Sequence, residues 1–139
     1  MPVAVEFLNA GRGVFSRASG HLDGAELVKA AAKINASHVE ARPILYSFFD
    51  FDGITGLTLS ATQIHEVADL GIAASRISNP GRVCAIHARN DLQFGLARMW
   101  QTFVAETAWE TDVFRERAEA VGWVRKRVAS IFGVQAELT

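Results

Sequence analysis

Two carboxylates, Asp50 and Asp52, lie two residues apart directly after the apolar run Ile44–Phe49. Paired carboxylates can share a proton for acid–base chemistry or hold a hard cation. His87, which ends a second apolar run, is the third residue that could join them. The competing interpretation is structural, because aspartates in turns commonly bond to backbone amides, here those of a glycine-punctuated loop at 53–56. We favour the structural interpretation and predict no catalytic residues and no enzyme activity.

The spacing of histidine and cysteine predicts no metal site and no cofactor. Histidines at positions 21, 38, 65 and 87 show neither His-x-His nor His-x-x-x-His spacing. Cys84 and His87 are the one close pair, and a strand would point them to opposite faces of the sheet. Cys84, the single cysteine, lies in the middle of this run, where we expect a buried and unreactive thiol.

A helix expected from residue 90 or 91 to about 107 carries the second group of candidate residues. Phe94, Arg98 and Gln101 share one face, with Gly95 beside them. This face could form a partner surface or the rim of a ligand pocket. Alternatively, Phe94 packs under the preceding loop and Arg98 pairs with an acid such as Asp91 or Asp52. The residues predicted to face the core are Leu92, Leu96, Met99, Phe103 and Val104.

Large aromatic side chains crowd the C-terminal half of the chain. Aromatic residues at helical spacing usually belong to a core, but so many around short elements could also line an apolar cavity. The residues concerned are Trp100, Trp109, Trp123, Phe103, Phe114 and Phe132.

Hydrophobic periodicity predicts the elements that position these residues. Two strands at 3–8 and 14–19 form a hairpin, and a helix follows from Asp23 to about residue 36. Ser60, three residues before Gln63, caps a helix that ends before Asn79-Pro80-Gly81. Further strands are expected at 44–49, 82–87 and 111–114, and a last helix at 117–132. The order is therefore β-β-α-β-α-β-α-β-α, which predicts one α/β domain over residues 1–139 with a mixed, mostly parallel sheet flanked by helices.

Composition and charge exclude several classes of protein. The formal net charge is −1 and the charges are mixed along the chain, so we expect no nucleic-acid partner. No secretory signal is visible and there are no 18 consecutive apolar residues, so we expect a cytoplasmic protein without an integral membrane segment.

Several motifs in this order resemble the bacterial SpoIIAA-like proteins, which are relatives of STAS domains and share a fold type with CRAL-TRIO lipid-binding domains. The motifs are ASGHLDGAEL, FFDFDGITGLTLSATQI, RVCAIHARNDLQFGLARMW and TDVFRERAEAVGWV. The resemblance covers about residues 3–125, and residues 126–139 look like an extension of the last helix and a tail. It implies a mixed sheet with helices packed against it and no established enzyme activity.

In phospho-regulated STAS proteins, a serine in an Asp-Ser pair at the start of the second helix is phosphorylated by a partner kinase. The corresponding place here is Thr58-Leu59-Ser60, which lacks the aspartate. A phosphate at a helix N-terminus is electrostatically favourable. Ser60 and Thr58 are therefore candidate phosphosites.

Three functional hypotheses follow. The first is a non-catalytic module that binds a small apolar or lipid-like ligand between the helices and the sheet, with the Phe94–Arg98 face at the pocket mouth. The alternative is a STAS-type interaction module that acts through a regulatory partner or a homodimer. An enzyme that uses Asp50, Asp52 and His87 is the least favoured.

Overall fold

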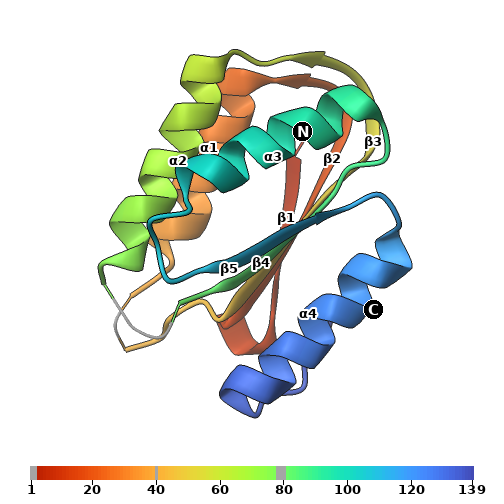
Figure 1. Cartoon of the computed structure of the whole chain (residues 1–139). Coiled ribbons are helices and arrows are strands. Elements are labelled where there is room, and N and C mark those ends of the chain that lie inside the picture. Colours follow the sequence, from red (N-terminus) through yellow and green to blue (C-terminus); the bar gives the residue numbers. More distant parts are fainter. Residues whose placement is uncertain (1–2, 40, 78–80) are drawn as a thin grey trace.

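Five strands form one sheet in the order β1-β2-β3-β4-β5, with helices on both of its faces (Figure 1). The structure is a computed structural model that describes residues 3–39, 41–77 and 81–139. The strands are β1 (Val3–Leu8), β2 (Gly13–Asp23), β3 (Tyr46–Thr58), β4 (Val83–His87) and β5 (Glu110–Phe114). The helices are α1 (Gly24–Ala36), α2 (Ala61–Ser75), α3 (Asp91–Phe103) and α4 (Arg117–Phe132), and a short 3-10 helix, η1 (Asn9–Gly11), joins β1 to β2.

The pairing of the strands confirms the predicted α/β class and element order. β1 is antiparallel to β2, whereas β2–β3, β3–β4 and β4–β5 are parallel. From β2 onward each new strand joins the same edge of the sheet, so crossovers of one hand place their helices on one face. Accordingly α1, α2 and α3 form one layer, and α4 covers the opposite face (Figure 1).

β3 lies in the centre of the sheet and buries side chains on both faces. Tyr46 and Phe48 point toward α4 and belong to the core on that side. Phe51 belongs to the core beneath α1, α2 and α3. Because successive side chains of a strand alternate between faces, each face receives every second residue of β3.

The predicted loop at 53–56 is wrong, because β3 continues through it to Thr58 in parallel pairing with β2. The two glycines permit close approach of the strands rather than a turn. A Cβ at Gly53 would lie 2.9 Å from the Ala18 carbonyl oxygen, and one at Gly56 would lie 2.6 Å from Nδ1 of His21. The ladder shifts register twice in this region. Asp50 and Asp52 therefore lie inside a strand.

The orientation predicted for α3 is also partly wrong. Leu92 is 64% exposed and Met99 36% exposed, whereas Gln93 and Ala97 are buried. The inward row of α3 has the predicted helical spacing, but each position lies one residue C-terminal to the predicted one. It comprises residues 93, 97, 100 and 104. Trp100 and Val104 supply apolar area in that row, and α3 packs against α2 and β5. The helix ends at Phe103, about four residues earlier than predicted.

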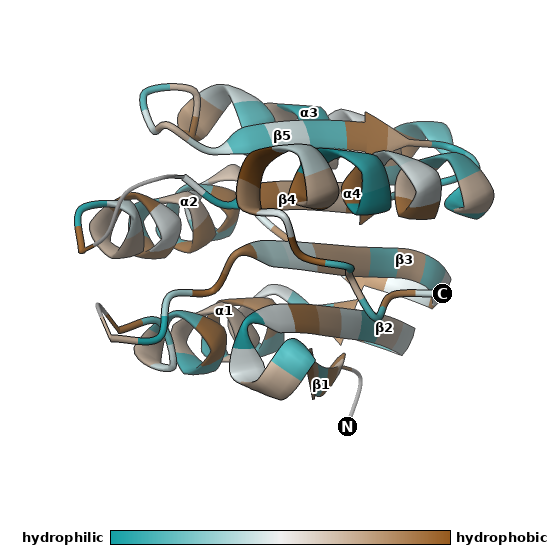
Figure 2. Ribbon diagram, turned by 90° about the horizontal axis from the view of Figure 1, so that it is seen from below, coloured by the Kyte–Doolittle hydropathy of each residue, from teal (hydrophilic) through white to brown (hydrophobic). Residues whose placement is uncertain are grey.

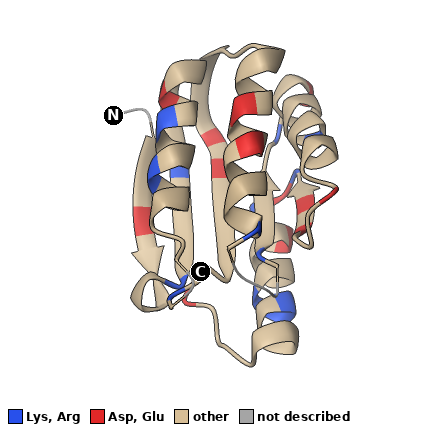
Figure 3. Cartoon of the chain, turned by 90° about the vertical axis from the view of Figure 1, so that its left-hand side faces the viewer, with Lys and Arg blue, Asp and Glu red and all other residues tan. Residues whose placement is uncertain are grey.

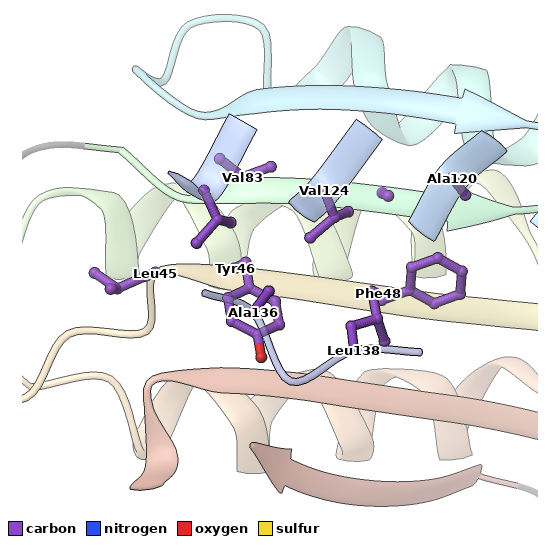
Figure 4. Close-up of a cluster of buried hydrophobic side chains, with 10 residues drawn as sticks. Leu45, Tyr46, Phe48, Val83, Ala120, Val124, Ala136 and Leu138 are labelled. Atoms are coloured by element: carbon purple, nitrogen blue, oxygen red, sulfur yellow. The ribbon is translucent and has the colours of Figure 1, made fainter. Parts of the chain in front are cut away.

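The chain after α4 completes the core on the α4 side. Gly133 ends the helix in the left-handed conformation at φ +66°, which glycine adopts without strain. The tail then runs between α4 and β2 (Figure 2) and buries Ala136 and Leu138 in the cluster that contains Tyr46 and Phe48 (Figure 4). Asn9 holds the tail in place. The Asn9 side-chain oxygen accepts from the Tyr46 hydroxyl and, at 3.0 Å, from the backbone amide of Glu137.

Titration of Tyr46 tests this packing. Burial raises the pKa of Tyr46 to about 12 from an ordinary value of 10.0. The protonated phenol therefore stabilises the fold below pH 10, and this stability is lost as the pH rises toward about 12. Tyr46 is the single tyrosine, so tyrosinate absorbance reports on it alone. We expect a midpoint near 12. A midpoint near 10 in protein that keeps its native circular dichroism would contradict the packed tail.

Candidate functional site

The structure brings together two of the three predicted polar residues, Asp50 and His87. They are register partners on the neighbouring strands β3 and β4. Nδ1 of His87 lies 3.0 Å from Oδ1 of Asp50, and both side chains are buried. The pair lies on the α4 face of the sheet, where Nε of Arg117 is 3.6 Å from Oδ2 of Asp50.

Every polar atom of the His87 ring already has a protein partner. Nε2 lies 3.2 Å from the Arg115 carbonyl oxygen, which can only accept, so this nitrogen carries a hydrogen. Oδ1 of Asp50 also accepts from the backbone amide of Asp52 at 2.9 Å. The structural interpretation predicted such bonds to amides of residues 53–56, which instead belong to β3. Both ring nitrogens of His87 are thus engaged within the protein, and the Asp50–His87 contact joins β3 to β4.

Asp52 lies apart from this pair. Its carboxylate is half exposed and forms an ion pair with Nε of Arg89 at 3.2 Å. In the part of the chain that the structure describes, no group of three or more histidine, cysteine, aspartate or glutamate side chains is placed to hold a metal ion. The three polar candidates thus form a buried pair and a separate surface ion pair.

The predicted face of α3 divides between the protein interior and the solvent. Phe94 is half-buried, and the guanidinium of Arg115 lies 4.3 Å from its ring centre. Gln101 donates to the Thr111 carbonyl oxygen at 2.8 Å, whereas Gly95 and Arg98 are exposed.

The acids proposed as partners of Arg98 have other partners. Asp91 pairs with Arg115 at 2.8 Å, and Asp52 pairs with Arg89. The predicted pairing of Arg98 with either acid is therefore wrong. Phe94 does contact the cluster of buried residues beneath α3, which agrees with the packing alternative.

Ser60 is the exposed N-cap of α2, and Thr58 is the exposed last residue of β3. The Ser60 hydroxyl oxygen accepts from the Gln63 amide at 3.1 Å, and the Gln63 side chain accepts from the Ser60 amide at 3.0 Å. This is the predicted capping box. The Thr58 hydroxyl lies 2.8 Å from Nε2 of His21. Both hydroxyls are accessible, and phosphorylation at either remains a prediction.

An apolar pocket of about 120 Å³ lies between the layer of α1, α2 and α3 and the sheet. It is lined by Leu27, Ala31, Ile34, Phe49, Phe51, Leu59, Ile64, Val67, Ile86, Leu96, Ala97, Trp100 and Trp109, among others. Two of the tryptophans suggested for a cavity, Trp100 and Trp109, are in this lining, whereas Trp123 packs on the α4 face. None of the four predicted mouth residues of α3 (Phe94, Gly95, Arg98 and Gln101) is in it.

The polar groups of the pocket gather at the end where β4 begins. Arg82 precedes β4 and is buried, and Ser47 donates from its hydroxyl to Sγ of Cys84 at 3.2 Å. Burial lowers the pKa of Arg82 and raises the pKa of Cys84. Burial and, secondly, the Arg82 charge lower the pKa of the nearby His38. Sequence reasoning missed Arg82, although its even spacing from Cys84 and Ile86 assigns it to the same face of the sheet.

Comparison with known proteins adds no assignment: no protein-family model matches the chain, and no curated protein matches it significantly. No helix among the described residues is both long and apolar enough to span a membrane. On the side seen in Figure 3, acidic and basic positions are scattered over helices and strands. The pocket is accordingly the feature on which a functional proposal can be built.

Replacing Asp50 tests the structural role of the buried pair. Asp50→Asn leaves His87 without its carboxylate and should lower the free energy of unfolding by roughly 3–5 kcal/mol. The control Asp52→Asn breaks only the half-exposed pair with Arg89 and should cost less than about 1 kcal/mol. Urea unfolding of both variants measures the difference. Equal losses in the two variants would contradict the assignment.

Proposed function

We propose that the protein is a non-catalytic binding module for a small apolar or lipid-like ligand held between the helix layer and the sheet. The observation that supports this best is the apolar pocket of about 120 Å³ beneath α1, α2 and α3. Native interiors contain few voids larger than a water molecule. A dry cavity of about 150 Å³ lined by aliphatic and aromatic side chains can bind benzene. The pocket therefore suits a ring or a short alkyl chain.

The energetic cost of leaving such a space empty also supports the proposal. At about 24 cal/mol per Å³, a closed and empty cavity of about 120 Å³ lowers the free energy of unfolding by about 3 kcal/mol, which is the upper limit for a pocket that is partly open to solvent. This is a large part of the roughly 5–15 kcal/mol that stabilises a typical domain. A ligand that fills the space restores the lost contacts.

The resemblance to SpoIIAA-like proteins, and through them to CRAL-TRIO domains, agrees with this proposal. It supplies an analogy of fold alone, which does not transfer function. The size of the pocket limits the analogy, since typical pockets for drug-sized ligands measure about 300–1,000 Å³. A ligand much smaller than a phospholipid is therefore proposed.

Filling the pocket tests the proposal. Ala31 lines the pocket from α1, and Ala31→Leu should weaken binding of 1-hexanol at least about tenfold, because the added carbons occupy its site. The same change should raise the free energy of unfolding by about 1 kcal/mol through added burial. Ala32→Leu, on the exposed side of the same helix, is the matched control and should change neither value.

Tryptophan fluorescence of Trp100 and Trp109 and ligand-observed NMR both report binding. A wild-type protein that ignores 1-hexanol, and from which native mass spectrometry of bacterially expressed material recovers no small molecule, would contradict the proposal. Equal affinity of the Ala31 and Ala32 variants would place any binding elsewhere.

A second candidate function is self-association, as in a STAS-type interaction module. Leu92 and Met99 lie seven residues apart on α3 and are both exposed, so they share an apolar outer face beside Gly95. Leu92→Glu should shift a dimer to monomer in sedimentation velocity, whereas Arg98→Ala on the same helix should not. A wild-type protein that sediments as a monomer at high concentration would exclude this candidate.

A further inference from the structure

Arg82 is a buried cation without a counter-ion among the described residues. Its side chain lines the pocket and is 4% exposed, and its guanidinium lies 4.3 Å from the ring centre of Trp109. Nε and Nη2 are both buried and have no hydrogen-bond partner among residues 3–39, 41–77 and 81–139. No acid in the described part of the chain forms an ion pair with it. A buried charge normally has a partner, and the described residues leave this one open to an acid supplied from outside.

The two unpaired nitrogens form one edge of the guanidinium. An edge made of Nε and Nη2 presents two parallel N–H groups, which match the two oxygens of a carboxylate. The protein contains this geometry elsewhere: Arg127 donates from Nε to Oε1 of Glu110 at 2.7 Å and from Nη2 to Oε2 at 2.9 Å. At Arg82 the donor edge is present, and no acid in the described part of the chain supplies the carboxylate.

A second unpaired polar atom lies in the same pocket. Asn35 lines the pocket from the end of α1, and its Nδ2 donates to the Ala31 carbonyl oxygen at 2.9 Å. Its Oδ1 is buried and has no partner among the residues that the structure describes. The remainder of the lining is almost entirely apolar, from Trp109 and Ile34 toward Phe51 at the far end. The pocket thus has one polar end and a long apolar wall.

We propose that this site binds a small amphiphilic carboxylate, with the carboxylate on the Nε–Nη2 edge of Arg82 and the apolar body along Trp109 and Trp100. The two N–H groups and single positive charge of that edge match a monoanion. A phosphate dianion would place excess negative charge and an unbonded oxygen in the same buried space. This inference rests on the proposed function and names the chemical class of its ligand.

The experiment compares four probes that share a six-carbon chain: hexanoate, 1-hexanol, hexylamine and hexyl phosphate. We expect wild-type protein at neutral pH to bind hexanoate at least about tenfold tighter than each of the others, because only hexanoate pairs with the arginine edge. Arg82→Met should lose this preference and keep its affinity for 1-hexanol. Arg127→Met, which removes the other side-on arginine, is the control and should keep the preference.

Two further measurements distinguish loss of recognition from misfolding of Arg82→Met. Arg82→Lys keeps the charge but offers no planar edge, so most of the preference for hexanoate should disappear. The thermal midpoint of ligand-free Arg82→Met should be equal to or above that of wild type, because an unpaired buried charge is removed. Hexanoate should raise the midpoints of the wild type and of Arg127→Met by more than it raises that of Arg82→Met.

Each remaining outcome overturns the inference. Equal binding of hexanoate and 1-hexanol by wild type, or a preference that survives in Arg82→Met or in full in Arg82→Lys, would remove Arg82 as the recognition element. Tighter binding of hexyl phosphate would overturn the carboxylate class. Failure to favour hexanoate while 1-hexanol still binds rejects this inference alone, whereas failure of all probes rejects the proposed function as well.

Discussion

The alternation of side chains along β3 is the constraint on which the rest of the structure depends. β3 is hydrogen-bonded to β2 on one side and to β4 on the other, so its side chains can leave only through the two faces of the sheet. Even positions such as Phe48 and Asp50 face α4, and odd positions such as Ser47 and Phe49 face the pocket. One strand therefore supports two separate interiors with different chemistry.

The two interiors treat buried charge in opposite ways. On the α4 face, Asp50 has His87, Arg117 and a backbone amide around it, so the charge is compensated within the protein. On the pocket face, Arg82 has an aromatic neighbour and no acid among the described residues. Proteins commonly break a local rule at functional sites and tolerate the loss of stability there. We interpret the compensated pair as structural and the uncompensated arginine as functional.

The fold could be predicted from the sequence further than the site could. The apolar runs, the capping box at Ser60 and the alternation of strands and helices led to the correct element order. Gly53 and Gly56 indicate a loop in the sequence, because glycine permits both a turn and the close approach of strands, and only the pairing with β2 distinguishes the two. The face of α3 was misassigned at Leu92 because two rows of apolar residues have helical spacing. The spacing of Arg82 indicates its face of the sheet, but whether an acid lies beside it depends on residues distant in sequence.

The central claim is that the pocket is a binding site whose polar end is Arg82. A crystal structure of the protein grown with hexanoate tests it most directly. We expect one hexanoate molecule in the pocket, with its two oxygens facing Nε and Nη2 of Arg82 and its alkyl chain against Trp109 and Trp100. A pocket that is empty or closed by its own side chains, or a hexanoate whose carboxylate points away from Arg82, would contradict it.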